Sequence, residues 1–593
     1  MEPTLTIDGD RLELRVTFAD KYAAKEIPGY RFERRKSNYE QSVWSYPVSA
    51  AAAREIVHHF PRVNMSRDAQ AAVEKSLWNA DLADALKARG TQLAAPLREY
   101  PIRRDVRGAD GKLLSMYQHQ ILASNLAMLL PSFALMAEVG TSKTVVVIAA
   151  AGRRYLDGEI RRVLVVAPKS VVQVWPREFA KWANFPFDVR ALTGSSARRV
   201  KMLHESQWDS WERECGPEDG GALQVAVTNY ESTWRIADAI AQWAPDMIVA
   251  DEFHRIKTPG ASQSKAMHKL GEIPAYKIGL SGTPVSQHPL DIFSPYKFMD
   301  ATIFGTSYGT FRNRHAIMGG FEGREVVAYK DLEGLERRMH SIGYRVTKEE
   351  CLDLPPVTPT VVPCELEPSA KKIYDAFARD ATIEIEEGRH MTGTNVLTKT
   401  LRLRQIAGGF LTDDDGLTEV VSTAKMEVFD DLLATLLDAG EKVIVFATFV
   451  AELDAIIRLI EKRKVGYVTI RGGIPDKIRN EAESRFQNDD SVRVFVGQLV
   501  AAGEGITLVA ARNTIFYSWD YSLIHYEQAS GRDDRPGQTR TVTHHHIVCD
   551  GTPDVGSLEA LQRKRNVADA VVDGQWRNLI SGRSVIAVNE FAK

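Results

Sequence analysis

The sequence contains little cysteine. Four cysteines occur in 593 residues, and none belongs to a C-x-x-C pair. They stand far apart, at Cys215, Cys351, Cys364 and Cys549. Disulfide frameworks and cysteine zinc sites need closely and regularly spaced cysteines, so neither is indicated. We therefore expect a protein of a reducing intracellular compartment.

Long apolar runs and a strong net charge are also missing. The longest apolar stretches, near 126–137 and 145–151, are shorter than the roughly 18 to 20 residues that span a bilayer. The first residues are acidic and strand-like, whereas a signal peptide has a basic start and an apolar core. Because 75 Lys and Arg stand against 78 Asp and Glu, the net charge is −3. We expect no membrane partner, and any nucleic-acid binding must use local basic patches.

The composition is that of a globular protein, with 44% hydrophobic and 26% charged residues. At roughly 150 residues per domain, the length suggests about four domains. Changes in pattern along the chain predict a small α+β N-terminal module, a helical linker, a first α/β lobe, a helical region, a second α/β lobe and a tail. Their predicted bounds are 1–62, 63–113, 114–300, 301–421, 422–575 and 576–593.

Short apolar runs alternate with amphipathic helices in two parts of the chain. In the first lobe the runs are FALMAEV, VLVVAPK, LQVAVTNY, DMIVADE and YKIGLSGTP. In the second lobe they are KVIVFAT, GYVTIRG, VRVFVGQ, NTIFYSWD and TVTHHHIV. Continuous Val, Ile and Leu runs of this length are typical of buried parallel strands. The sequence thus predicts an α/β fold with two parallel-sheet lobes.

One loop, AEVGTSKT, has the residues of a phosphate site between a predicted strand and an apolar helix. Phosphates bind to backbone N–H groups at a helix N-terminus, with a lysine to balance charge and a hydroxyl to hold Mg²⁺. Gly140, Thr141 and Ser142 would supply the amides, and Lys143 and Thr144 the charge and the hydroxyl. Ser142 stands where glycine is usual, which restricts the loop if that position requires positive φ. The alternative is an ordinary strand-to-helix turn.

The apolar run DMIVADE ends in two carboxylates, Asp251 and Glu252. A carboxylate at a strand tip can hold Mg²⁺, and a second one can orient or deprotonate the water that attacks a phosphoanhydride. A solvated acidic turn is the alternative. The phosphate loop in the same predicted sheet favours the catalytic interpretation.

Two arginines, Arg532 and Arg535, lie three positions apart in QASGRDDRPGQ. On one helical turn they can point the same way and stabilise charge on a transferring phosphoryl group. Taken alone, such a pair is more often exposed surface charge.

Together with further motifs, these segments resemble the SNF2 family of superfamily 2 helicase-like motors in type and in order. The matching segments are MYQHQ, AEVGTSKT, APKSVVQVWPREFAKW, VADEFH, SGTP, GEGIT and QASGRDDRPGQ. The resemblance covers about 114–575. It implies two RecA-like lobes with a helical region between them, ATP and Mg²⁺ as cofactors, and double-stranded or forked DNA as partner.

The resemblance also implies residue roles. Gln118 would contact the adenine, Gly505 the nucleotide, Thr144 and Asp251 the metal, and Arg532 and Arg535 would act from the second lobe on closure. The candidates for the DNA track are Lys169, Trp182, Thr283 and Thr507. Ser142 and Phe253 depart from the family pattern, yet neither removes a catalytic side chain.

The N-terminal segment IPGYRFERRKSNYEQSVWSYPV resembles, less closely, the HARP-like module of annealing helicases. Its cations are Arg31, Arg34, Arg35 and Lys36, and its aromatic residues are Tyr30, Phe32, Trp44 and Tyr46. Cations beside stacking faces are typical of a binder of single-stranded or forked DNA. The alternative is a small β domain whose aromatics form its core.

The sequence therefore predicts a monomeric, ATP-dependent translocase on double-stranded DNA. One alternative is an annealing or branch-migrating helicase at forks. Another is a nucleic-acid-binding scaffold whose nucleotide loop is weakened by Ser142. A compact motor of this type is expected in the cytoplasm of a bacterial or phage-infected cell, at the nucleoid.

Overall fold

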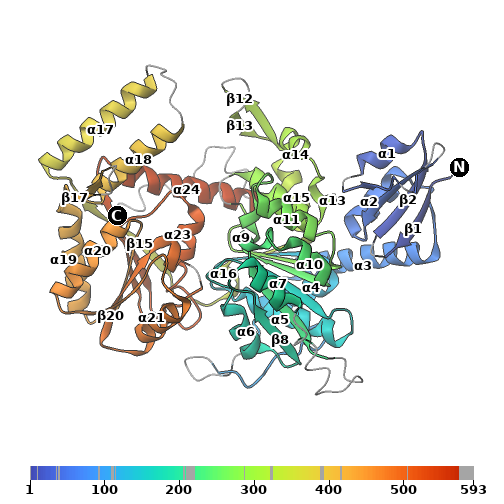
Figure 1. The fold of residues 1–593 in the computed structure, drawn as a ribbon, viewed down its shortest axis with the longest axis horizontal. Coiled ribbons are helices and arrows are strands. Elements are labelled where there is room, and N and C mark those ends of the chain that lie inside the picture. The colour runs from blue at the N-terminus through green and yellow to red at the C-terminus, as the bar shows by residue number, and fades with distance from the viewer. Residues whose placement is uncertain are drawn as a thin grey trace. The chain divides into compact units, whose positions relative to one another are not determined.

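The computed structural model describes residues 2–9, 11–27, 29–34, 36–37, 41–90, 94–107, 113, 115–204, 208, 221–285, 288–320, 325–386, 393–413, 417–503 and 505–572. The chain forms two compact units (Figure 1). Unit 1 comprises Met1–Cys351 and Val567–Arg577, and unit 2 comprises Leu352–Asn566 and Asn578–Lys593. Each contains one large, fully parallel sheet, so the predicted fold class is confirmed.

Unit 1 begins with a small α+β module, here called the N-terminal module. Its sheet has the order β3 (Arg31–Phe32), β4 (Gln41–Pro47), β2 (Arg11–Thr17), β1 (Thr4–Asp8) and β5 (Asn64–Met65). Its helices are α1 (Lys21–Glu26), α2 (Ala50–His59) and α3 (Arg67–Arg89). Trp44 and Tyr46 lie in the core of the module with Leu12 and Leu14. These two aromatic rings therefore stabilise the module.

The N-terminal module packs closely against the rest of unit 1. Gly29 has φ 77°, and a Cβ at this position would lie 2.7 Å from Cγ2 of Thr302 in α13 (Ala301–Phe304). At the far end of α3, Nζ of Lys87 donates a hydrogen bond of 2.8 Å to the carbonyl of His340 in α15 (Leu332–Ile342). Two separate contacts thus hold the module in place.

The large sheet of unit 1 has seven parallel strands. Their order is β14 (Gly343–Val346), β6 (Ser132–Ala137), β11 (Tyr276–Ser281), β10 (Met247–Asp251), β7 (Arg162–Ala167), β9 (Leu223–Asn229) and β8 (Phe187–Ala191). The five apolar runs predicted for the first lobe correspond to β6, β7, β9, β10 and β11. The two edge strands were not predicted, because β8 is only half-buried and β14 has four residues.

The helices of unit 1 follow its strands and cover the sheet. They are α4 (Gln118–Leu129), α5 (Lys143–Leu156), α6 (Val174–Trp182), α7 (Ser196–His204), α9 (Tyr230–Thr233), α10 (Ala237–Trp243), α11 (Ser262–Leu270), α12 (Phe293–Met299), α13, α14 (Tyr308–His315), α15 and α16 (Lys348–Cys351). Two 3₁₀ turns, η2 (Phe253–Ile256) and η3 (Pro289–Ile292), and the hairpin β12 (Ala316–Gly319) and β13 (Glu325–Tyr329) complete it. Among the described residues, no helix of the chain combines the length and apolar character needed to cross a bilayer.

Unit 2 contains a six-stranded parallel sheet. Its order is β15 (Val357–Cys364), β22 (Val542–Cys549), β21 (Asn513–Phe516), β18 (Val443–Ala447), β20 (Val492–Gln498) and β19 (Gly466–Ile470). The helices are α17 (Pro368–Glu386), α18 (Gly393–Ala407), α19 (Ala424–Asp438), α20 (Val450–Lys462), α21 (Asp476–Asn488), α22 (Leu499–Ala502), α23 (Leu523–Ser530) and α24 (Pro553–Val572), of which the residues from Val567 belong to unit 1. A short hairpin pairs β16 (Phe410–Thr412) with β17 (Thr418–Val420).

Strand β15 lies in the region predicted as helical between the lobes. It contains Pro359 and Pro363, which disfavour a strand assignment because proline has no N–H to donate. At the edge of a sheet, one side of a strand needs no partner, and β15 is an edge strand. The region 301–421 is divided between the units at Cys351. The exact domain bounds given above stay predictions.

Candidate active site

The three motifs of the first lobe meet at one edge of the unit 1 sheet. Strands β6, β11 and β10 are neighbours, with Met136 opposite Ser281 and Leu280 opposite Asp251. Because the strands are parallel, the loop after β6, the SGTP segment after β11 and the carboxylates after β10 all emerge at their carboxyl ends. Open α/β sheets bind their ligands at this edge.

The loop after β6 contains a non-glycine residue in the left-handed region. Ser142 has φ 58° and ψ 60°, and α5 begins at the next residue. This conformation costs an L-residue roughly 1 to 2 kcal/mol. The restriction expected from the sequence therefore applies to Ser142. Gly140 also has positive φ, 99°, at no such cost.

The donors of this loop fit a triphosphate with its metal. The Lys143 ammonium donates a 2.9 Å hydrogen bond to the carbonyl of Ala137, so it lies over the loop at the start of α5. The Thr144 hydroxyl has no hydrogen-bond partner within the described part of the chain. An ammonium, the first amides of a helix and an available hydroxyl are the groups that bind phosphates and Mg²⁺.

Two buried residues of α4 hold the loop from behind. Nε2 of His119 lies 3.1 Å from the carbonyl of Thr141, and Nε2 of Gln120 lies 3.2 Å from it and 3.3 Å from that of Ser142. Burial lowers the pKa of His119, so a neutral ring donates through Nε2. Neither contact was predicted, although the polar start of α4, Gln118 to Gln120, before an apolar run was a usable signal. Gln118 is exposed, at the first residue of α4.

Asp251 is held rigidly at the end of β10. Its side chain is buried, and Oδ2 accepts a 3.1 Å hydrogen bond from Nε1 of Trp175. Its carbonyl accepts a 2.8 Å bond from the hydroxyl of Tyr230, whose pKa is raised by burial and by the Asp251 charge. Sequence analysis assigned Trp175 no role of its own. The structure adds an orienting role toward the carboxylate.

Glu252 is linked to the SGTP segment through a histidine. Glu252 has φ 52°, and its Oε2 lies 3.3 Å from Nδ1 of His254. The same nitrogen lies 2.9 Å from Oγ of Ser281. Ser281 Oγ in turn accepts a 3.1 Å hydrogen bond from the amide of Thr283. One serine hydroxyl therefore connects the predicted catalytic carboxylate with a predicted DNA-track residue.

An ion pair fixes the other side of the loop. Oε1 of Glu138 lies 3.2 Å from Arg345 of β14, and its Oε2 accepts a 3.0 Å bond from the amide of Lys348. Arg345 also donates to the carbonyl of Gly282 at 3.3 Å. A Cβ at Gly282 would lie 3.1 Å from Cγ2 of Val139. The loop and the SGTP segment thus share one support that sequence reasoning missed.

In unit 2 the two predicted motifs bind each other. Arg532 donates to the carbonyl of Ile506 at 3.1 Å, and Arg535 donates to Oγ1 of Thr507 at 2.8 Å. Burial lowers the pKa of Arg535 to about 10, which leaves it charged at neutral pH. Gly505 has φ 72° in the adjoining turn. The structure therefore brings both arginines together with the GEGIT segment, of which Glu504 lies outside the described residues.

Asp533, between the two arginines, holds their turn in position. It is 1% exposed and accepts a 2.5 Å hydrogen bond from Oγ1 of Thr514 on β21. Nε2 of His544 on β22 lies 3.2 Å from the same carboxylate. The turn that carries Arg532 and Arg535 is thus fixed to two strands of the sheet.

The DNA-track candidates differ in accessibility. Lys169 is exposed just after β7, whereas Thr283 is buried. Trp182 is 6% exposed and lies in the core of unit 1, so its ring is a packing residue. A role for its segment in DNA binding stays a prediction.

The basic residues of the N-terminal module also differ. Arg31 and Arg34 are exposed. Lys36 forms ion pairs with Asp8, at 2.7 Å, and with Glu13. Arg35 lies outside the described residues.

Comparison with known families decides the affiliation. Residues 117–423 match the SNF2-related domain, and residues 424–537 match the helicase conserved C-terminal domain. The chain belongs to the SNF2 family. The matched SNF2 segments begin at residue 117, so the resemblance of the N-terminal module to a HARP-like module stays a prediction.

Relatives of this SNF2 chain include a DNA repair and recombination protein RAD54-like from Gallus gallus, 25% identical over 449 residues. That match covers 70% of this chain and 60% of the relative. The DNA annealing helicase and endonuclease ZRANB3 of Bos taurus is 25% identical over 450 residues, which are 74% of this chain and 39% of the relative. The chain thus spans about 60% or less of these relatives.

Among solved structures, the Sulfolobus solfataricus SWI2/SNF2 ATPase core in complex with dsDNA is similar to this chain. It is 26% identical, and the match covers 83% of this chain and 97% of that one, with a TM-score of 0.36.

Proposed function

We propose that this chain is a DNA-stimulated ATPase that moves along double-stranded DNA. The observation that carries this proposal is the shared hydroxyl of Ser281, which contacts both His254 and Thr283. A change at Thr283 on binding DNA would shift Ser281, then His254, and so the carboxylate of Glu252. Membership of the SNF2 family and the RAD54-like relatives support the same proposal.

The residues of unit 1 would bind and activate the substrates of ATP hydrolysis. Lys143 would neutralise the phosphates, and Thr144 and Asp251 would hold the Mg²⁺ that enters with ATP. Glu252 would orient the attacking water. Arg532 and Arg535 of unit 2 would stabilise negative charge on the transferred phosphoryl group, which couples hydrolysis to movement of that unit.

The DNA contacts would be made mainly to phosphates. Lys169 and the segments around Thr283 and Thr507 remain our candidates for this track. Phosphate contacts carry no sequence information directly, and they release counterions. We therefore expect weak sequence preference and strong salt dependence. We further propose that the protein acts as a monomer in the cytoplasm, at the nucleoid.

Two variants test the ATPase proposal. Lys143→Ala and Glu252→Gln are expected to abolish DNA-stimulated ATP hydrolysis while DNA binding is largely kept, because neither side chain belongs to the track. The matched control is Lys265→Ala, which changes an exposed lysine on α11. ATP turnover and duplex binding would be measured side by side. Wild-type turnover that is indifferent to duplex and forked DNA would contradict the proposal.

The second candidate function is an annealing or branch-migrating helicase at forks. It is favoured by the firmly docked N-terminal module and by the name of the ZRANB3 relative, a DNA annealing helicase. ATPase stimulation by single-stranded, duplex, forked and four-way-junction DNA separates the two functions. A maximum with junctions or forks favours the second candidate, and a maximum with plain duplex favours the first.

A further inference from the structure

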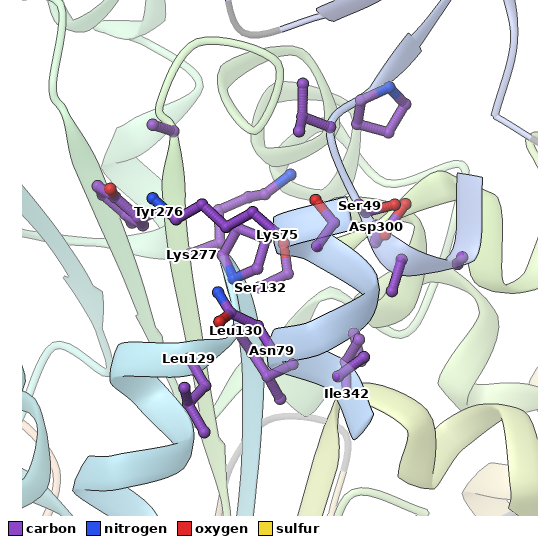
Figure 2. Close-up of a pocket in the computed structure, with 18 of the residues that line it drawn as sticks. Ser49, Lys75, Asn79, Leu129, Leu130, Ser132, Tyr276, Lys277, Asp300 and Ile342 are labelled. Carbon is purple, nitrogen blue, oxygen red and sulfur yellow. The ribbon is translucent and has the colours of Figure 1, made fainter. Parts of the chain in front are cut away.

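A cavity of about 520 Å³ lies between the N-terminal module and the large sheet of unit 1 (Figure 2). Its walls include Ser49 of the module and Lys75 of α3 on one side, and Leu130, Ser132 and Tyr276 on the other. Ser132 and Tyr276 are the first residues of β6 and β11. The cavity is therefore at the amino edge of the sheet, at the opposite end of the strands from the candidate active site.

The charged residues that line this cavity are mostly basic. It contains six basic residues, Arg11, Arg54, Lys75, Arg98, Arg154 and Lys277, and three acidic ones, Glu159, Glu272 and Asp300. Two of the acidic residues are already engaged. Glu159 pairs with Arg154, and Oδ1 of Asp300 accepts a 2.9 Å hydrogen bond from the amide of Thr302. Arg54 and Arg98 are likewise engaged, with Asp81 and Asp157. Basic residues outnumber acidic ones in the lining by six to three.

The N-terminus of α2 also faces the cavity. Ser49 caps this ten-residue helix by accepting a bond from the amide of Ala52, and Ser49, Ala50 and Ala51 all line the cavity. The first amides of a helix have no carbonyl partner within it, and the helix dipole makes this end positive. Anions bind at such ends when a cation is close by.

Two lysines supply cations from the two walls. Lys75 has no hydrogen-bond or ion-pair partner among the described residues, and Figure 2 shows it reaching from α3 toward the wall that carries Tyr276. From that wall, Lys277 donates a 3.1 Å hydrogen bond to the carbonyl of Gly271. Because Lys75 is exposed and has no such partner among the residues that the structure describes, its ammonium group can form an ion pair with an anionic ligand.

We propose that this cavity binds a phosphate-bearing anion between the N-terminus of α2 and the two lysines. Its size is that of a ligand pocket for small molecules. The apolar side chains of Leu130 and Ile342 and the ring of Tyr276 would contact the rest of the ligand. A free polyphosphate or nucleotide and the 5′-phosphate of a DNA strand share this chemistry.

The cavity has walls from both the N-terminal module and the large sheet. A ligand that touches both walls stabilises their docked arrangement by its binding free energy. Binding of a phosphate ligand would therefore strengthen the contact between the N-terminal module and the rest of unit 1.

The test uses the full chain with Lys143→Ala, so that the nucleotide loop contributes little phosphate binding. The probes are inorganic tripolyphosphate, a short 5′-phosphorylated deoxyoligonucleotide and the same strand without its phosphate, each measured by calorimetry. Lys75→Gln is expected to weaken binding about tenfold, as for loss of one charged hydrogen bond. Ala50→Glu is a second variant, because an acidic residue in the first turn favours the helix and repels an anion. Lys265→Gln is the matched control.

Tripolyphosphate binding that both variants weaken supports a free phosphate ligand. Binding of the phosphorylated strand alone, weakened by both variants, supports a DNA end. Failure of all probes to bind, equal binding of the two strands without tripolyphosphate binding, or affinities that neither variant changes would overturn the proposal. Hydrolysis is not measured, so the outcome is independent of the proposed ATPase.

Discussion

Two residues of the candidate active site have left-handed backbone conformations although neither is glycine. They are Ser142, with φ 58°, and Glu252, with φ 52°. Each is held by neighbours, Ser142 through Gln120 and Glu252 through His254. Strain of this kind persists where the surroundings determine the conformation. At Glu252 the proposed orientation of water requires the carboxylate, whereas at Ser142 the strain serves no contact that glycine would lose.

Ser142→Gly is expected to raise the free energy of unfolding of unit 1 by about 0.5 to 1 kcal/mol, because relief of strain exceeds the entropy that glycine adds to the unfolded chain. Denaturant unfolding measures this change. Ser142→Ala is the control, since it removes the hydroxyl and keeps the strain. Equal stability of the two variants would show that the backbone is not the cause.

Ser281→Ala is expected to reduce the stimulation of ATPase activity by DNA more than the basal activity. It removes the hydroxyl that His254 and Thr283 share. The ratio of turnover with and without duplex DNA is the measurement. Ser132→Ala, a buried serine at the opposite edge of the same sheet, is the matched control. An unchanged ratio in Ser281→Ala would exclude this hydroxyl as the link.

At the scale of elements, sequence patterns predicted what local composition determines. The runs DMIVADE and VRVFVGQ gave β10 and β20, because buried parallel strands are apolar on both faces. Strand β15 was missed because its prolines are tolerated only at an edge, and edge position depends on strands far away in the sequence. The site shows the same division. Lys143 and Asp251 were predicted because each belongs to a local motif, whereas the supporting roles of Gln120, Trp175 and Arg345 were not predicted. Their partners are distant in sequence.

One glycine, Gly29, lies at a close contact between the N-terminal module and the rest of unit 1. Gly29→Ala would place a Cβ 2.7 Å from Thr302, on a backbone with φ 77°. We expect a loss of about 1 to 3 kcal/mol from overpacking and strain, and faster proteolysis between module and sheet. Gly9→Ala is the matched control, because Gly9 has φ 59° and no atom within 4 Å of its Cβ position. Equal effects of both changes would assign the loss to backbone strain alone.

At the scale of the whole molecule, half-buried or buried histidines with lowered pKa values occur in both units. Burial lowers the pKa of His268 to about 4 in unit 1, and those of His545 and His546 to about 4 and about 3 in unit 2. All three stay neutral in the folded protein at neutral pH. Unfolding would return each to a pKa near its ordinary value of about 6.5.

Acid is therefore expected to destabilise both units. The folded pKa values of these histidines are lower than the unfolded ones. Their contribution to the free energy of unfolding is therefore fully present above about pH 6.5 and is lost as the pH falls toward the folded values. At pH 5 each of the three histidines would have lowered the free energy of unfolding by roughly 2 kcal/mol. Thermal unfolding between pH 7.5 and 5 measures the loss. His545→Asn should flatten the pH dependence of unit 2, whereas His58→Asn, at an exposed position, should not.

The pairing of β15 with β22 has a mechanical consequence. The chain enters unit 2 just before β15, and after β22 it continues into α24, within which it passes from unit 2 to unit 1. Strands β15 and β22 are parallel and pair in register from Val357 and Val542 to Cys364 and Cys549. Tension on the chain would pull the start of one strand and the end of the other in opposite directions. Such a load shears the whole ladder at once, whereas an antiparallel hairpin would open bond by bond. The proposed translocase, which would pull on its DNA track, would in this way resist being unfolded by its own force.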